Sequence, residues 1–304
     1  MRRVLALPLV ALSAVALAVA AGCGESATTD AGPAPLRSLT GVAAASREAS
    51  SGRFELELVQ SFGGQDLTMT AEGAFDTAAQ RSELSFDMSA LAKLLGGLGQ
   101  AFGAGSSDLE GFDDPANWKL DAVQDGTVVY FRFPLLASKL PDGKEWIRAD
   151  AAQLAQQRGV DLDQLGSFAS VDPRDALTAL EAVTGGLVVV GREDVRGVAT
   201  THYTASIDPA KIAGQSGASG DVLASFRQAL AQLGLTAVPI QVWVDDEGLV
   251  RRFVIDVAMT PQGAADEVRM TMTLDVFDYG TPVSVGLPAA GDVAELTELT
   301  GLTP

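Results

Sequence analysis

Two side chains with distinctive chemistry occur once each in this chain of 304 residues, the thiol of Cys23 and the imidazole of His202. Three segments precede Cys23. They are a basic start at Arg2-Arg3, an apolar run over residues 4–19 and the three small residues Ala20-Ala21-Gly22. This order is typical of a secretory signal that is cleaved before the cysteine. A thiol at the new amino terminus is placed for thioether linkage to a lipid. The pattern therefore predicts a signal peptide over residues 1–22 and lipidation of Cys23.

The segment around Cys23 resembles the lipobox of bacterial lipoproteins, with Ala20 where leucine is usual three residues before the cysteine. The resemblance implies acyl chains such as palmitate, which would hold the protein on the extracytoplasmic face of the cell membrane without a transmembrane helix. Two other interpretations stay open, an uncleaved anchor helix and a plain secretory signal. The first is disfavoured because the apolar run of 16 residues is shorter than the ~20 that span a bilayer.

His202 lies in a segment that alternates apolar and polar residues, on the polar side with Thr200 and Thr204. We therefore expect an ordinary exposed histidine on a strand. The sequence contains no serine-hydrolase elbow, zinc-protease helix or nucleotide-binding glycine loop, and no cysteine or histidine pair to hold zinc. We expect no enzyme activity, no cofactor and no metal. Calcium binding at acidic turns and a two-carboxylate glycosidase are the less favoured alternatives.

The chain is strongly acidic, with a formal charge of −18 that becomes −20 once the two positive charges of Arg2 and Arg3 are removed. Such a charge repels nucleic acid and anionic lipid headgroups. Membrane contact is therefore expected through acylated Cys23 rather than through a basic patch. A single cysteine also excludes a disulfide framework.

Residues 24–35 are small and polar, so residues 23–35 are predicted to be a flexible tether that carries the lipidated Cys23. Residues 36–304 show no break in composition, and we expect one domain there. Eleven segments of that domain alternate apolar and polar residues with the period of a β-strand. They are Arg53–Leu58, Leu67–Phe75, Arg81–Met88, Trp118–Ala122, Thr127–Phe133, Trp146–Ala149, Leu187–Arg192, Val198–Ile207, Val238–Val244, Arg251–Met259 and Val268–Val276. Hairpin turns are expected at Gly63-Gly64, Asp125-Gly126, Asp142-Gly143 and Asp245–Gly248.

Four segments have the apolar periodicity or capping residues of a helix. They are Leu36–Ala49, Leu91–Phe102, Pro173–Val183 and Val222–Leu233. Strands and helices do not alternate regularly, which disfavours a parallel sheet. The sequence predicts an α+β fold, a large curved antiparallel sheet that forms a half-open barrel of about 11 strands with helices on its concave face.

Four stretches carry a family resemblance across most of the mature chain. They are Ser51–Leu56, Thr68–Asp76, Arg196–Tyr203 and Val242–Arg252. In order and in pattern they resemble the LppX and LprG type lipoproteins of actinobacteria, whose fold is similar to that of LolA, the periplasmic lipoprotein carrier. The resemblance implies a hydrophobic cavity that holds acyl chains, a lipid or glycolipid ligand and no catalytic residues.

The apolar side of the predicted strands supplies the candidate cavity. Five of the six methionines fall there, and methionine suits surfaces that accommodate variable apolar partners. The candidate cavity residues are Phe54, Leu56, Met69, Ala71, Leu84, Phe86, Met88, Leu94, Leu95, Val242, Ile255, Val257, Met270, Met272 and Leu274. The leading hypothesis is a membrane-anchored lipoprotein that carries lipid between envelope sites, with a possible envelope transport protein as partner. The alternative is an envelope sensor or scaffold of the same fold that binds a protein partner.

Overall fold

The computed structural model describes residues 39–62, 64–93, 111, 114–150, 153, 180, 187–207, 237–259 and 268–296. Contacts divide the chain into two units, Met1–Pro35 and Leu36–Pro304, and every described residue belongs to the second unit. Several predicted features lie outside the described residues. They are Cys23, most of the predicted helix Leu91–Phe102, including Leu94 and Leu95, and nearly all of the predicted helices Pro173–Val183 and Val222–Leu233. Among the described residues, no helix has the length and apolarity needed to cross a membrane.

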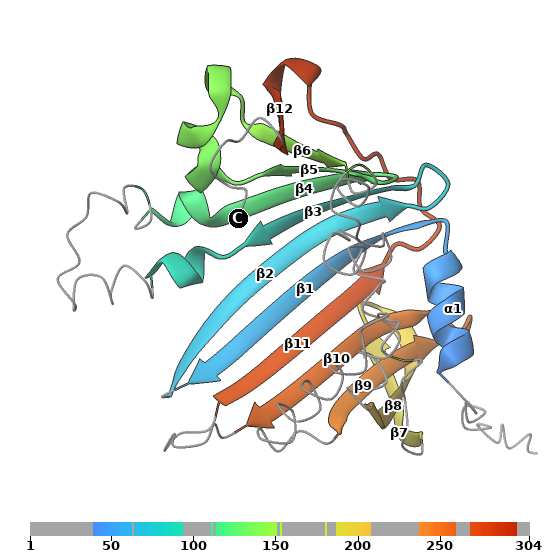
Figure 1. Ribbon diagram of the computed structural model, residues 1–304. Helices are drawn as coiled ribbons and strands as arrows, with labels where there is room; N and C mark the ends of the chain where they lie inside the picture. Colours follow the sequence, from blue (N-terminus) through green and yellow to red (C-terminus); the bar gives the residue numbers. More distant parts are fainter. Residues whose placement is uncertain are drawn as a thin grey trace, which may run out of the picture. The chain divides into compact units, whose positions relative to one another are not determined.

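Twelve strands form one open sheet in the described part of the chain (Figure 1). The order across the sheet is β12-β6-β5-β4-β3-β2-β1-β11-β10-β9-β8-β7. The bounds are β1 Ser51–Phe62, β2 Gln65–Asp76, β3 Arg81–Asp87, β4 Lys119–Asp125, β5 Val128–Arg132, β6 Trp146–Asp150, β7 Val188–Val195, β8 Val198–Ile207, β9 Val238–Asp245, β10 Val250–Met259, β11 Val268–Phe277 and β12 Val293–Glu295. The eleven predicted strands correspond to β1 to β11, so the α+β fold with a large open sheet is confirmed.

The twelfth strand corrects the prediction of a purely antiparallel sheet. Three residues of β12 pair in parallel with β6, and all other described pairings are antiparallel. Three residues are too few for an alternating pattern to be recognised in a sequence. β12 was therefore missed.

Two hairpin turns show why turn residues predicted the strand ends. Gly126 joins β4 to β5 with φ 59°, and Gly248 lies between β9 and β10 with φ 82°, a left-handed conformation that glycine adopts without strain. The Asp142-Gly143 prediction was wrong in detail. That pair lies in the short 3₁₀ helix η3 Pro141–Gly143, within a longer connection between β5 and β6.

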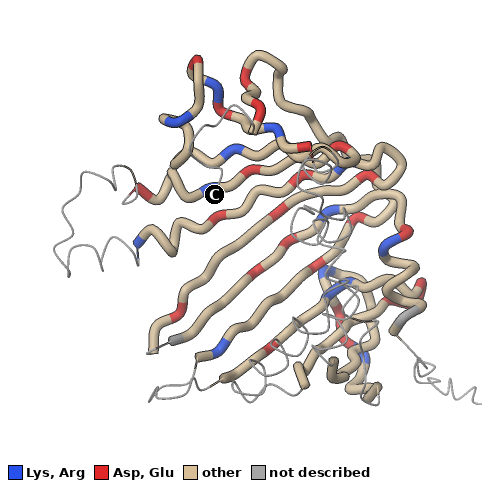
Figure 2. The backbone as a smooth tube through the Cα atoms, in the orientation of Figure 1, with Lys and Arg blue, Asp and Glu red and all other residues tan. Residues whose placement is uncertain are grey.

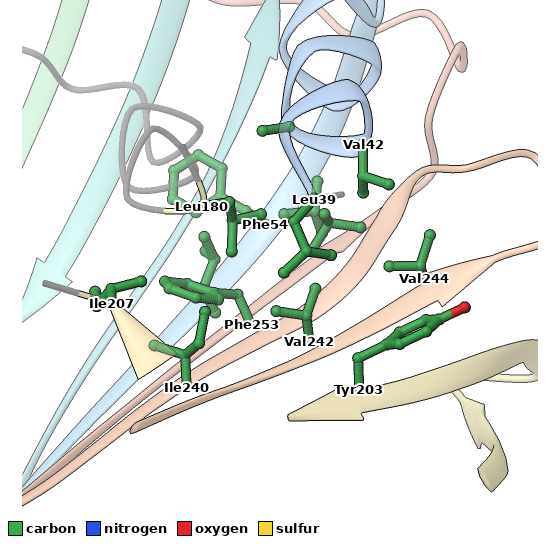
Figure 3. Packing of buried hydrophobic residues seen from close by; sticks show 14 of the residues in the cluster. Leu39, Val42, Phe54, Leu180, Tyr203, Ile207, Ile240, Val242, Val244 and Phe253 are labelled. Carbon is green, nitrogen blue, oxygen red and sulfur yellow. The ribbon is translucent and has the colours of Figure 1, made fainter. Parts of the chain in front are cut away.

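The described helix α1, Thr40–Glu48, falls inside the predicted helix Leu36–Ala49. Val42 and Ala43 of α1 and the preceding Leu39 join one buried cluster with side chains of the sheet, among them Phe54 and Phe253 (Figure 3). The Ser46 hydroxyl donates to the Val42 carbonyl (2.9 Å) and accepts from the N–H of Val250 at the start of β10 (2.9 Å). This hydroxyl fixes the helix to the sheet without an unpaired polar group in the core. Residues 89–93 are also α-helical and include the start of the predicted helix Leu91–Phe102. The described 3₁₀ turns are η1 Pro115–Trp118, η2 Pro134–Lys139, η3 and η5 Ala290–Asp292.

Candidate functional site

One face of the sheet is apolar across many strands. Residues that lie directly opposite each other in neighbouring strands project from the same face, so the pairing register identifies this face. Leu56 of β1 is paired with Ala71 of β2 on one side and with Leu274 of β11 on the other. The row continues through Phe253 and Val242. The apolar face is therefore continuous across the centre of the sheet.

The predicted cavity residues that the structure describes share this face. They occupy four successive rows that run across the strands. The first row contains Phe54 and Leu84, and the second contains Leu56, Ala71, Phe86, Leu274 and Val242. The third row contains Met69, Met272 and Ile255, and the fourth contains Met270 and Val257. Met88 follows directly after β3, with its N–H bonded to the carbonyl of Trp118 (2.9 Å). Contact of these side chains with a lipid stays a prediction. Gln60 also lies on this face, opposite Leu67 and Met270. The sequence did not predict it there because its side chain is polar.

Burial is uneven along the apolar face. Phe54, Val242 and Leu274 are at most 1% exposed and belong to the close-packed cluster with α1. Further along the strands, Met270 is half-buried, as is Met272, which packs on the edge of that cluster. The first group therefore works as structural core, and half-buried residues such as Met270 and Met272 are better placed to contact a ligand.

The opposite face of the sheet is polar and charged, with acidic and basic positions along neighbouring strands (Figure 2). Two pockets lined by described residues, of about 480 and 590 Å³, open mainly onto this face. Their charged lining residues are chiefly acidic, and burial raises the pKa of Glu83 in one of them, against the opposing charge of Arg53. Polar and charged side chains line these hollows together with four of the predicted cavity residues, Leu56 and Ala71 in the smaller hollow and Phe54 and Leu84 in the larger.

His202 lies on the predicted polar face but is not exposed. Its side chain is buried, and its ring stacks on Trp243 with the centroids 4.0 Å apart. Nδ1 is 2.9 Å from Oε1 of Glu193, and Nε2 is 3.0 Å from Oε1 of Gln241. The Trp243 indole N–H donates to the other Glu193 oxygen (2.7 Å), and these bonds from Trp243 and His202 lower the pKa of Glu193. His202 is thus a fully bonded structural residue.

A second group that sequence reasoning missed surrounds Asp275 on β11. Its carboxylate accepts two hydrogen bonds from Arg252 (2.6 and 2.7 Å) and one from Arg196 (3.0 Å), and Arg196 also pairs with Glu55. Burial by itself raises the pKa of Asp275, but the hydrogen bonds from the two guanidinium groups outweigh it and hold the pKa below its usual value. Arg196 lies at the tip of the β7–β8 hairpin, so this cluster ties that hairpin to the centre of the sheet. Nothing in the local sequence indicates a pairing between residues 79 positions apart.

No protein-family model matches the chain. A curated relative, an uncharacterized 31.2 kDa protein of the rplA–rplJ intergenic region of Streptomyces griseus, is 34% identical over 167 residues, 53% of this chain and 52% of the relative. The chain thus matches about half the length of that relative.

Among solved structures, lipoprotein LppX of Mycobacterium tuberculosis is 15% identical, with 81% of this chain and 98% of LppX covered and a TM-score of 0.41. LprF of Mycobacterium bovis is 13% identical, with 83% of this chain and 95% of LprF covered and a TM-score of 0.40. The proteins of similar structure thus include lipoproteins of the LppX type, the family that the sequence resembles.

Proposed function

We propose that the protein is a membrane-anchored lipoprotein that holds the acyl chains of a lipid or glycolipid on the apolar face of its sheet and moves that lipid between sites of the cell envelope. The observation that carries the proposal is the continuous apolar face, which is close-packed near α1 and on which the side chains of Met270 and Met272 are half-buried. Methionine adapts to ligands of varied shape because its side chain is flexible and polarizable.

Binding on this face would be driven by removal of methylene groups from water, at about 0.8 kcal/mol for each buried methylene before ordering costs. The polar headgroup would stay in solvent. No step of this function needs a catalytic group, and we propose a protein without enzyme activity. Within the described ranges, no three His, Cys, Asp or Glu side chains are grouped closely enough to hold a metal ion.

The first prediction concerns bulk on the apolar face. Met270→Trp is expected to reduce the lipid recovered per protein by roughly half or more, with little change in the thermal midpoint, because the indole fills ligand space. Thr273→Trp is the matched control, since Thr273 lies on the same strand but lines the polar pocket of about 480 Å³. Mass spectrometry of organic extracts measures the lipid, and differential scanning calorimetry measures the midpoint.

A different pair of results would reject the proposal that the protein carries lipid. In a solid core, overpacking at Met270 costs about 1 to 3 kcal/mol and lowers the thermal midpoint. If Met270→Trp lowers the midpoint and the wild-type protein never yields lipid, the sensor or scaffold interpretation is the better account.

The second prediction tests the anchor. Cys23→Ser removes the thiol, so no thioether can form and the protein should leave the detergent phase in a phase-separation assay. Lipid binding on the apolar face should be unchanged, because Cys23 precedes the folded unit Leu36–Pro304. Unchanged partition into detergent would reject lipidation at Cys23 while leaving the carrier proposal standing.

A further inference from the structure

Gln60 places an amide group in an otherwise apolar row of the sheet. It lies on β1 between Leu67 of β2 and Met270 of β11, and Val257 of β10 continues the row. Leu67 and Val257 are buried, whereas Gln60 and Met270 are half-buried. The amide therefore lies on the face that we propose binds acyl chains, beside one of the methionines best placed to contact them.

The side chain of Gln60 has no partner of its own. In the part of the chain that the structure describes, no hydrogen bond involves its amide group. Gln124, at the end of β4, instead donates from its amide to the carbonyl of Gly126 (3.1 Å). A half-buried amide bonds to water while the face is open, but acyl chains that cover the face displace this water. Because a buried amide without a partner is costly, a lipid bound here has to supply a hydrogen-bonding group to Gln60.

Gln60 also lies near one end of the apolar face. Toward α1, Phe54 lies six residues earlier on β1, about 20 Å away at ~3.3 Å per residue, and belongs to the close-packed cluster. In the other direction, Gln65 of β2 lies on the same face as Leu67 and is exposed. The hairpin that joins β1 to β2 is at the end of these strands away from α1 (Figure 1). Acyl chains that lie along the strands would therefore run toward α1, with the polar end of the lipid at the hairpin.

We propose that the Gln60 amide donates a hydrogen bond to the carbonyl oxygen of the ester that joins an acyl chain of the lipid to its headgroup. This inference rests on the proposed function, because it requires lipid on the apolar face. An ester lies at the boundary between acyl chain and headgroup, and Gln60 lies at the matching boundary between the apolar rows and the exposed Gln65. The face then selects acyl esters over alkyl ethers of the same length, since an ether has no carbonyl and leaves the amide unpaired.

Competition between two lipids tests this donor. The full chain carrying Cys23→Ser, in mild detergent, is mixed with equal amounts of dipalmitoyl phosphatidylcholine and dihexadecyl phosphatidylcholine, which have ester and ether linkages respectively. The zwitterionic headgroup avoids repulsion from the acidic chain. Mass spectrometry of the bound fraction measures the ratio of ester to ether lipid, which should be about fivefold to tenfold in favour of the ester.

Gln60→Met should bring this ratio to about one, because methionine suits a row that already contains Met270 but has no N–H to donate. The amount of ether lipid bound should not fall. Thr68→Val is the matched control, since Thr68 is exposed on the polar face opposite Val59, one residue after Leu67. It should keep the wild-type ratio. The thermal midpoint of each variant verifies that the protein is folded.

Two sets of results would overturn the inference, and they are distinguishable. A ratio near one in the chain with Gln60, or the same ester preference after Gln60→Met, would overturn the role of Gln60 and leave the proposed lipid binding standing. A hydrogen bond from Gln60 to a headgroup hydroxyl would give the first of these results, because the two lipids would bind alike. Failure of the chain with Gln60 to retain either lipid would overturn the proposed function and this inference together.

Discussion

Gly73→Ala is expected to lower the free energy of unfolding by about 3 kcal/mol or more. Gly73 lies in β2 between Phe54 of β1 and Leu84 of β3. A Cβ atom at this position would overlap the carbonyl oxygen of Glu83 and the ring of Phe54. The carbonyl belongs to the neighbouring strand and the ring is 1% exposed, so neither can move away without disturbing the centre of the sheet.

Urea unfolding measures this effect, and Gly41→Ala is the matched control. Gly41 lies in α1, and no atom outside its immediate surroundings is within 4 Å of a Cβ placed there. Alanine should stabilise the helix at that position by up to about 1 kcal/mol. Equal small effects of both substitutions would contradict the close approach of Phe54 to Gly73.

Asp275→Asn should reduce stability by about 2 to 3 kcal/mol, because it leaves Arg252 and Arg196 without the carboxylate that they share. Arg196 comes from the β7–β8 hairpin, so faster amide hydrogen exchange is expected along β7. Asp278→Asn is the matched control. Asp278 pairs with Arg53 at the surface (3.0 Å), where an ion pair contributes about 0.5 kcal/mol.

The pH dependence of stability gives Asp275 a second signature. Its pKa is lower in the folded protein than in the unfolded chain, where an aspartate titrates near 3.9. Its contribution is therefore complete above about pH 4 and is lost as the pH falls through the lower folded value. Urea midpoints measured between pH 5 and 2 should fall less steeply in Asp275→Asn than in the wild type. Parallel curves would exclude Asp275 as a source of acid sensitivity.

The strands could be predicted because one face of the sheet is apolar and the other is polar. In β2, Leu67, Met69 and Ala71 are buried while the intervening Thr68 and Thr70 are exposed, and this alternation is visible in sequence. The same alternation assigned the candidate cavity residues to one face. It did not indicate how deeply each would be buried, because burial depends on which helix covers which end of the sheet.

The charged clusters of the polar face could not be predicted. His202 was correctly placed on that face, but Trp243 and Glu193, which bury it, come from two other strands. Asp275 meets Arg196 only because the sheet brings β11 and the β7–β8 hairpin together. Charged residues in alternating strands are expected to face solvent, and only the tertiary structure shows which of them are buried in pairs.

The strand order also constrains the order in which the parts of the sheet can form during folding. β1 to β6 are neighbours in the order in which they are made, and so are β7 to β11, with contacts that are mostly local. β1 and β11 pair in the middle of the sheet, although Arg53 and Phe277 are separated by more than two hundred residues. Each half can therefore form its hairpins early in folding through local contacts, whereas the two halves join only when β11 pairs with β1. The central seam of the sheet is therefore among the last of its contacts to form.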